Sequence, residues 1–422
     1  MKTLIISSMY PYPKDNGKSI IISSILEYLI SQFGSENVDY MLIGNEGEVA
    51  EKENQQNIEI FQLEKPKFIT QLKNLFLYSA IKRDKSIQES MLYSKKIKGQ
   101  MNEIIKSKEY ELIIYDTIRI AQYFEKEHSP NAKEIVYLDD LFSERYKKML
   151  EVLKNNKEVE LNPLGNFSKF LPSFSQSLIN FRLINQMLLS YEKNLVKKRE
   201  NVIANSFTSL LLISEKEVNL LSKRTNSENI RSINPVLKEH SSYTRIPSDK
   251  KRFLFLGSLN IPHNEASILN FIEVNKEFLK NNATKVHIDI VGKNASTKLK
   301  ELVKTFSNIT IHGFIEDLDE LMDLSAAMIV PLIFGSGVKL KTLDAFSKGL
   351  PVITTDFGIE GINVIPDVDC IVENDIGNFP ERMLEILNRD YNKRISTQSY
   401  DFFVRNYSKE NVYKEYSTIF KK

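Results

Sequence analysis

The sequence predicts an α/β protein with two doubly wound parallel sheets, and three observations carry that prediction. At 422 residues the chain is too long for one ordinary core and suits two domains of roughly 200 residues each. Short apolar runs alternate with amphipathic stretches, as in parallel sheets covered by helices. A polar stretch then interrupts the alternation, which begins afresh after it. We expect an N-terminal domain over 1–242, a linker over 243–251, a C-terminal domain over 252–405, and a helix over 406–422 that can pack back on the N-terminal domain.

The expected elements of the N-terminal domain follow one another at regular intervals. Helical periodicity is clearest over 20–33 and 86–107, between runs of apolar residues. The expected strands are 3–8, 39–43, 111–115, 134–138 and 201–205.

The C-terminal domain repeats the pattern with short apolar strands that end in glycine or polar residues. Its last segment, 411–420, is helical in pattern. The expected strands are 252–257, 286–292, 309–313, 327–332 and 351–354.

The composition excludes several classes of protein. Lys and Arg total 57 against 55 Asp and Glu, so no overall field favours nucleic acid as a partner. The single cysteine, Cys370, excludes an internal disulfide and fits a reducing compartment. The first apolar run is too short for a signal peptide, and no run of about 18 apolar residues occurs. We expect a cytoplasmic protein, or one peripheral to the inner face of a membrane.

Basic residues concentrate in the first half of the chain, above all in residues 65–98. This stretch carries nine basic residues against Asp84 and Glu89. Within it Phe68, Leu72, Leu75 and Phe76 form one apolar stripe flanked by Lys67, Lys73, Lys82 and Arg83. The pattern fits either a helix lying on an anionic membrane surface or a solvated helix whose stripe packs on its own domain.

A loop with two glycines is the most informative local feature. The strand at 327–332 leads into Gly335, Ser336, Gly337 and Val338, and then into a helix with Lys339 and Lys341 near its start. Glycines let backbone N–H groups approach phosphate oxygens, and a helix N-terminus with lysine attracts anions. Such loops also occur as simple tight turns. Two lysines at a helix N-terminus are unfavourable unless an anion binds there, which favours a diphosphate site.

These motifs resemble the family-4 retaining glycosyltransferases of the GT-B fold, particularly those of bacterial surface polysaccharides. The resemblance covers nearly the whole chain. It rests on residues 255–259 with 262–264, on 290–292, 312–318 and 334–346, on 357–361, and on a first loop at 11–18. It implies two Rossmann-like domains facing a central cleft. It also implies transfer of a sugar, with retained configuration, from a nucleotide-diphosphate sugar to a saccharide or lipid-linked acceptor.

The resemblance also assigns roles to individual residues of the donor site. The donor would bind mainly the C-terminal domain, with no cofactor and no metal ion. Lys339 and Lys341 would neutralise the departing diphosphate, the base would meet backbone near Phe314 and Ile315, and Asp344 would bind ribose. The remaining donor-binding candidates are Gly17, Gly257, Ser258, His263, Asn264, Gly292, Gly335, Ser336, Gly337 and Val338. We expect His263 to lie in the loop after the first C-terminal strand, within reach of phosphate.

The chain departs from the family pattern at four positions. Ser336 and Asp344 stand where the family commonly has two glutamates. Ser258 and Asn264 stand where many members have an Arg and a Lys aimed at phosphate. Our hypothesis is that Lys339 and Lys341 replace this lost charge. The same departures favour an alternative, in which the chain is an inert GT-B protein that serves as partner or chaperone of a related transferase. A nucleotide-sugar epimerase would need more cleft carboxylates and histidines.

Carboxylates at strand ends are the candidates on the acceptor side. Asp139 and Asp140 end a predicted strand and could orient an acceptor hydroxyl, with Asp116 and Arg145 nearby. The pair could instead cap a helix with an ion pair to Arg145. A metal site of the other large transferase fold and a glycosidase pair fit the flanking residues less well, since adjacent carboxylates on a strand point apart.

Overall fold

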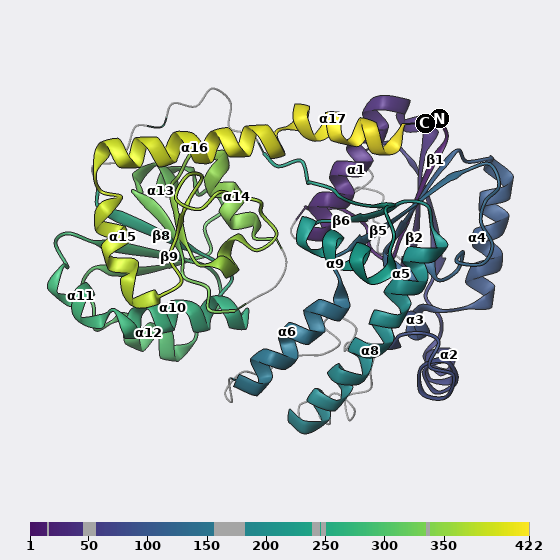
Figure 1. Ribbon diagram of the computed structural model, residues 1–422, viewed down its shortest axis with the longest axis horizontal. Coiled ribbons are helices and arrows are strands. Elements are labelled where there is room, and N and C mark those ends of the chain that lie inside the picture. Colours follow the sequence, from purple (N-terminus) through teal and green to yellow (C-terminus); the bar gives the residue numbers. More distant parts are fainter. Residues whose placement is uncertain are drawn as a thin grey trace. The chain divides into compact units, whose positions relative to one another are not determined.

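A computed structural model of the chain describes residues 1–14, 17–44, 56–155, 182–238, 245, 250–334 and 338–421. The chain divides into two compact units. Unit 1 comprises Met1–Pro235 with Tyr413–Lys422, and unit 2 comprises Val236–Val412. Figure 1 shows that each unit is a sheet covered by helices.

The sheet of unit 1 is parallel throughout, with strand order β3-β2-β1-β4-β5-β6-β7. Its order reverses between β1 and β4, where Thr3 pairs with Leu112. The strands are β1 (Thr3–Ser7), β2 (Val38–Gly44), β3 (Glu59–Glu64), β4 (Leu112–Asp116), β5 (Lys133–Asp139), β6 (Leu210–Leu212) and β7 (Ile230–Ser232).

The helices of unit 1 follow the strands in the order that parallel pairing requires. They are α1 (Gly17–Phe33), the short η1 (Ser35–Asn37), α2 (Phe68–Asn74), the π-helical η3 (Leu75–Ile81), α3 (Ile87–Leu92), α4 (Lys95–Lys108), α5 (Thr117–Ala121), α6 (Phe142–Asn155), α8 (Arg182–Ser206), α9 (Glu215–Thr225) and α17 (Lys409–Phe420).

Two of the expected elements of unit 1 are wrong. Residues 201–205 are not a strand but the last turns of α8, and the strand β6 follows at Leu210–Leu212. A short apolar run cannot be assigned to helix or strand by periodicity alone. The expected helix 86–107 is two helices, because α3 ends at Leu92 with Tyr93 in an extended conformation and the side chain of Ser94 caps the start of α4.

The sheet of unit 2 is also parallel, with strand order β10-β9-β8-β11-β12-β13. Its order reverses between β8 and β11. The strands are β8 (Arg252–Leu256), β9 (His287–Val291), β10 (Ile309–Gly313), β11 (Ala327–Val330), β12 (Val352–Thr354) and β13 (Ile371–Val372).

The helices of unit 2 connect successive strands and then close the unit. They are α10 (Pro262–Val274), α11 (Lys276–Asn281), α12 (Thr297–Val303), α13 (Asp319–Leu324), α14 (Leu340–Ser347), the short η5 (Asp356–Ile359) and η6 (Ile376–Asn378), α15 (Phe379–Glu385) and α16 (Arg389–Tyr407).

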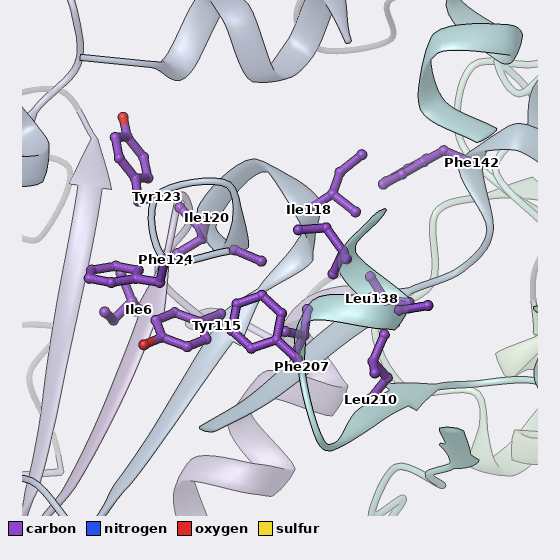
Figure 2. Packing of buried hydrophobic residues seen from close by; sticks show 14 of the residues in the cluster. Ile6, Tyr115, Ile118, Ile120, Tyr123, Phe124, Leu138, Phe142, Phe207 and Leu210 are labelled. Atoms are coloured by element: carbon purple, nitrogen blue, oxygen red, sulfur yellow. The ribbon is translucent and has the colours of Figure 1, made fainter. Parts of the chain in front are cut away.

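Each sheet has an apolar core against its helices. In unit 1 the ring of Tyr115 lies 5.0 Å from that of Phe124 and 5.6 Å from that of Phe207, and Figure 2 shows this cluster. In unit 2, Phe253 and Phe255 belong to one core cluster and Leu254 to another, because successive side chains of a strand point to opposite faces. The predicted fold class, two doubly wound parallel sheets, is confirmed.

The last residues of the chain pack on unit 1. The ring of Tyr28 in α1 lies 5.0 Å from Tyr413, 5.4 Å from Tyr416 and 5.9 Å from Phe420. The hydroxyl of Tyr416 donates a hydrogen bond of 2.7 Å to the carbonyl of Asn234. The chain therefore passes from unit 1 to unit 2 after Pro235 and returns after Val412.

Candidate functional site

Cationic side chains gather where β8 and β11 end, at the point where the strand order of unit 2 reverses. Ligands of doubly wound sheets commonly bind at such points, outside the carboxyl ends of the strands. Lys339 is the N-cap residue of α14 and is buried, and Lys341 lies in the first turn of the same helix. His263 and Asn264 lie in the first turn of α10. The sequence analysis expected a loop for His263, but Pro262 starts the helix one residue earlier.

Lys341 is held across the space between the two helix N-termini. Its ammonium donates a hydrogen bond of 3.0 Å to Asn264 Oδ1 and lies 5.1 Å from the centre of the Phe255 ring. The amide nitrogen of Asn264 in turn donates to the carbonyl of Ser258 at 3.0 Å. Since both ends of this buried amide have partners, its orientation is fixed and so is the position of the ammonium.

Desolvation and repulsion between neighbouring cations lower the pKa values in this cluster. Burial, and then Lys339, lower the pKa of Lys341 to about 7. Burial, Lys339 and Lys341 lower the pKa of His263 to about 4, so this imidazole is neutral at physiological pH. Desolvated cations close to one another raise the free energy of the site unless an anion joins them. The arrangement can therefore bind a multiply charged anion.

Two predicted glycines are explained by the close approach of β8 and β9. A Cβ at Gly292 would lie 1.9 Å from the carbonyl oxygen of Gly257, and a Cβ at Gly257 would lie 2.8 Å from the side chain of Asn264. Any side chain at Gly257 would thus displace the amide that holds Lys341. These glycines shape the site through packing.

An aromatic side chain stands exposed next to the strand end of β10. Gly313 has a φ of +71°, which turns the chain so that Phe314 is 71% exposed while Ile315 packs on the core. The ammonium of Lys293 lies 5.9 Å from the centre of the Phe314 ring. An exposed aromatic face beside a cation suits a flat ligand group such as a base.

Asp344 lies on α14, three residues after Lys341, so the two side chains share one helix face. Burial and then Asp319 raise the pKa of its carboxyl, while Lys238 and Lys348 lower it. Val338 packs near Gly361, where an added Cβ would meet it at 2.8 Å. Gly335, Ser336 and Gly337, which the sequence analysis placed in the phosphate loop, lie outside the described residues.

A second polar cluster lies at the corresponding point of unit 1, where β1 and β4 end. Asp116 accepts a hydrogen bond of 2.6 Å from the hydroxyl of Ser7 and pairs with Lys18 at 2.8 Å. Gly17 begins α1, so Lys18 lies in its first turn. The sequence analysis missed Lys18. A lysine at a helix N-terminus was the available signal, as it was for Lys339 and Lys341.

Asp139 ends β5 in this second cluster, and Asp140 follows it directly. Tyr137 donates a hydrogen bond of 2.9 Å to Asp139, and Arg145 Nε donates one of 2.7 Å to Asp140 Oδ2. Among the described residues, the buried Oδ1 of Asp140 has no hydrogen-bond partner. The predicted ion pair between Asp140 and Arg145 is thus present, and one carboxylate oxygen remains for a further donor.

The backbone of the second cluster is strained. Thr117 has a φ of +68° and Asp139 a φ of +70°, in the left-handed region that side-chain-bearing residues seldom adopt. Strain of this kind persists at functional sites, where the surrounding structure holds it.

Burial raises the pKa of Asp139, as does the neighbouring Asp140, whereas Lys18 and Arg145 lower it. Burial and Asp140 raise the pKa of Glu217 to about 8, which adds a residue of α9 that the sequence analysis did not identify.

The described residues contain no group of three or more His, Cys, Asp or Glu side chains arranged to hold a metal ion. In the same part of the chain, no helix is long and apolar enough to cross a membrane. The candidate residues of the donor site, Gly17 apart, lie in unit 2, and those of the acceptor site lie in unit 1.

Known proteins resemble this chain in sequence and in fold. The family described as "Glycosyl transferases group 1" matches residues 250–389. An uncharacterised 44.6 kDa protein in the cps region of Klebsiella pneumoniae is 23% identical, over 100% of this chain and 99% of its own length.

Solved structures share the fold over the whole chain. Sucrose-phosphate synthase from Thermosynechococcus elongatus has a TM-score of 0.64 at 13% identity, with 99% of this chain and 97% of that chain covered. HepE from Anabaena, solved in complex with UDP, has a TM-score of 0.63 at 11% identity, with 99% of both chains covered. Residues 250–389 thus form a glycosyl transferases group 1 domain, and the whole chain has the GT-B fold.

Proposed function

We propose that the protein transfers a sugar from a nucleotide-diphosphate sugar to a saccharide or lipid-linked acceptor in surface polysaccharide synthesis. In this proposal the anomeric configuration is retained, no metal ion or cofactor takes part, and the reaction occurs at the inner face of a membrane. The relative from a cps region supports the pathway class. The Anabaena structure that holds UDP supports a nucleotide donor.

One observation carries the proposal: the two lysines, Lys339 and Lys341, at the N-terminus of α14, where Lys341 also contacts the first turn of α10. Breaking the bond between sugar and diphosphate leaves charge on the phosphate oxygens, which must be stabilised as it develops. Lys339 and Lys341 supply positive charge there, and the N-termini of two helices add partial charges. The neutral His263 can donate a hydrogen bond to a phosphate oxygen. These groups together do the work that a divalent cation does in other transferases.

The contact between Lys341 and Asn264 supports the hypothesis that charge has moved within the site. Related transferases often carry a lysine at the position of Asn264. In this chain the ammonium comes from α14 instead and hydrogen-bonds the side chain at that position, at 3.0 Å. We infer that Lys341 supplies from one helix the charge that the family supplies from another, and that Asn264 positions it.

The remaining donor contacts are proposed on the resemblance to the family and, for the described residues, on their positions. Phe314 offers an exposed face for the base, with Ile315 anchoring its loop, and Asp344 offers a carboxylate for ribose hydroxyls. Gly335, Ser336, Gly337 and Val338 are proposed to supply backbone and hydroxyl hydrogen bonds to the diphosphate and the sugar. Gly17 is proposed to approach the donor phosphate from unit 1.

The polar cluster of unit 1 is proposed to bind the acceptor. Two ion pairs hold it, one between Lys18 and Asp116 and one between Arg145 and Asp140. A paired cluster suits a neutral hydroxyl better than an ion. The unpartnered oxygen of Asp140 and the carboxyl of Asp139 can accept hydrogen bonds from acceptor hydroxyls, and the acceptor proton passes to the departing phosphate oxygen as the new bond forms.

The test is direct titration of the protein with UDP, GDP and dTDP, without and with EDTA. We expect one nucleotide to bind, with affinity unchanged by EDTA. The double variant Lys339→Ala with Lys341→Ala should weaken binding by on the order of 100-fold or more. A matched control, Lys300→Ala with Lys304→Ala, removes two exposed lysines of unit 2 and should bind as the wild type does.

Binding that survives loss of both lysines would refute the assignment of the leaving-group site. A protein that binds none of the three nucleotides would instead fit the inert partner or chaperone.

A further inference from the structure

The helical segment that begins at Phe68 has its polarity inverted. Its apolar side chains point to solvent: Phe68 is 41% exposed, Ile69 80%, Leu72 45%, Phe76 67% and Ile81 58%. A helix that packs on its own domain normally buries this face. Exposed apolar patches of this kind mark surfaces that meet another apolar body.

The polar residues of the same segment attach it to unit 1. The amide nitrogen of Asn74 donates to the carbonyls of Ser90 at 3.1 Å and Tyr93 at 2.7 Å. The hydroxyl of Ser79 donates to the carbonyl of Ser86 at 3.2 Å. Both side chains are buried. The segment is therefore attached to unit 1 by hydrogen bonds on its inner side, while the apolar side chains on its other side are exposed.

Exposed cations surround the apolar side chains. Lys67, Lys73, Lys82 and Arg83 are all exposed. Lys82 lies 5.2 Å from the centre of the Tyr78 ring and Arg83 lies 5.9 Å from that of Tyr191. Of the two acidic residues within 65–98, Glu89 is buried and bonded to Arg199, which leaves Asp84 as the exposed one. The surface therefore combines apolar side chains with a net positive rim.

We propose that these residues form a platform, the 67–83 platform, that docks on an anionic lipid bilayer. The apolar side chains would enter the boundary between headgroups and acyl chains, and the cations would pair with lipid phosphates. A second copy of the chain is a poor occupant, because a twofold contact through this surface would bring the same cations face to face. A neutral apolar partner would leave the cations without a role.

The platform is linked to the polar cluster of unit 1. It bonds to α3, and Gln88 of α3 accepts a hydrogen bond of 3.3 Å from Arg119. Arg119 Nε donates to the hydroxyl of Thr117 at 3.0 Å, next to Asp116. Figure 1 places α2 at the margin of unit 1 beside α3. A bilayer on the platform would thus lie at the end of the sheet where Asp116 and Asp139 stand.

The bilayer is a partner for the proposed function. The proposal rests on that function in one respect, because docking on a bilayer would bring the protein to a lipid-linked acceptor. The binding itself does not depend on catalysis. Vesicle binding and nucleotide binding can therefore fail separately, and each is measured on the same full-length preparations.

The experiment is sedimentation with phosphatidylcholine vesicles that contain either no anionic lipid or about 30% phosphatidylglycerol, which is anionic. We expect binding to the anionic vesicles alone, weakened by salt. Replacing Lys67, Lys73, Lys82 and Arg83 with Gln should lower partition by on the order of 100-fold. Ile69→Ser with Phe76→Ser should lower it by roughly 10-fold. UDP, GDP or dTDP binding should stay unchanged in both.

Two control variants match these changes elsewhere. Replacing the exposed Lys276, Lys285, Lys300 and Lys304 with Gln removes the same charge from unit 2, and Val274→Ser with Leu384→Ser removes two exposed apolar side chains there. Both controls should partition as the wild type does. The proposal would be overturned if the controls lost as much vesicle binding as the platform variants, or if the platform variants bound vesicles as the wild type does. It would also be overturned if sedimentation velocity showed a dimer that the platform variants abolish.

Discussion

The polar clusters of the two units occupy the same place in the same kind of sheet, yet their charges are arranged in opposite ways. In unit 1, Lys18 is paired with Asp116 and Arg145 with Asp140. In unit 2, Lys339 lowers the pKa of Lys341, and both lysines lower the pKa of His263. A cluster that has neutralised its own charge can hold a neutral hydroxyl. A cluster of cations stores electrostatic repulsion that a bound anion relieves.

The largest expected effect separates the two clusters by their role in turnover. Asp139→Asn should lower turnover by on the order of 100-fold or more, because a hydroxyl-orienting carboxylate becomes an amide. Nucleotide binding should stay within a factor of two. Asn adopts a positive φ readily, so the strained backbone at 139 is retained. Two quantities are measured, the steady-state rate with a nucleotide sugar and the Kd for the nucleotide. If both worsened equally, the two clusters would not have separate roles.

The second prediction exchanges the side chains at positions 341 and 264, which moves the positive charge from α14 to α10. Lys341→Asn should weaken nucleotide diphosphate binding by on the order of 100-fold, since a charge-assisted contact is lost. Adding Asn264→Lys restores a cation and an amide in exchanged positions, so affinity should recover by at least 10-fold. Calorimetric titration of both variants measures this. A double variant no better than the single one would show that the site of the charge on α14 is itself required.

A smaller effect concerns pH. Because the pKa of Lys341 is lowered to about 7, the free site loses this charge as pH rises, and a bound diphosphate restores it. Affinity should therefore fall by up to about tenfold per pH unit above pH 7.5, where the nucleotide itself no longer titrates, with uptake of a proton on binding. Lys341→Arg stays charged and should flatten the profile. Titrations in two buffers of different ionisation enthalpy measure the proton, and none taken up would contradict the coupling.

The smallest effect concerns stability. Folding lowers the pKa of Lys341, so near pH 7 the unfolded chain binds more protons here than the folded one, and stability rises as pH rises from about 7 toward the unfolded pKa. Lys341→Met removes a desolvated charge and should stabilise the nucleotide-free protein by about 1–3 kcal/mol at pH 7, visible as a higher melting temperature. The paired Lys18 offers the contrast, since Lys18→Met leaves Asp116 unpaired and should destabilise. A lower melting temperature for Lys341→Met would argue against stored repulsion.

More of the fold than of the site could be predicted from the sequence. Strands such as β1 and β8 are buried, continuous apolar runs, so their residues identify them without any partner. Residues 201–205 have a similar short apolar pattern and were expected to form a strand. They are helical because they belong to α8, which extends from Arg182 to Ser206.

The site depended on contacts that no local pattern records. Lys339 and Lys341 were identified because charge at a helix N-terminus is a local signal. The bond between Lys341 and Asn264 joins residues 77 positions apart, and the pair of Lys18 with Asp116 joins the first turn of α1 to the end of β4. The strained φ at Asp139 likewise comes from its tertiary surroundings rather than from its own preference.

The aromatic contacts of Tyr28 with Tyr413, Tyr416 and Phe420 have a consequence for the newly made protein. The first unit of the chain to leave the ribosome lacks one of its own helices until the last residues are synthesised. Tyr28, which is buried in the finished protein, must wait for the whole of unit 2 to be translated before it is covered. A chain that stops before Tyr413 would carry this exposed aromatic surface permanently, and would present itself to chaperones and proteases as unfinished.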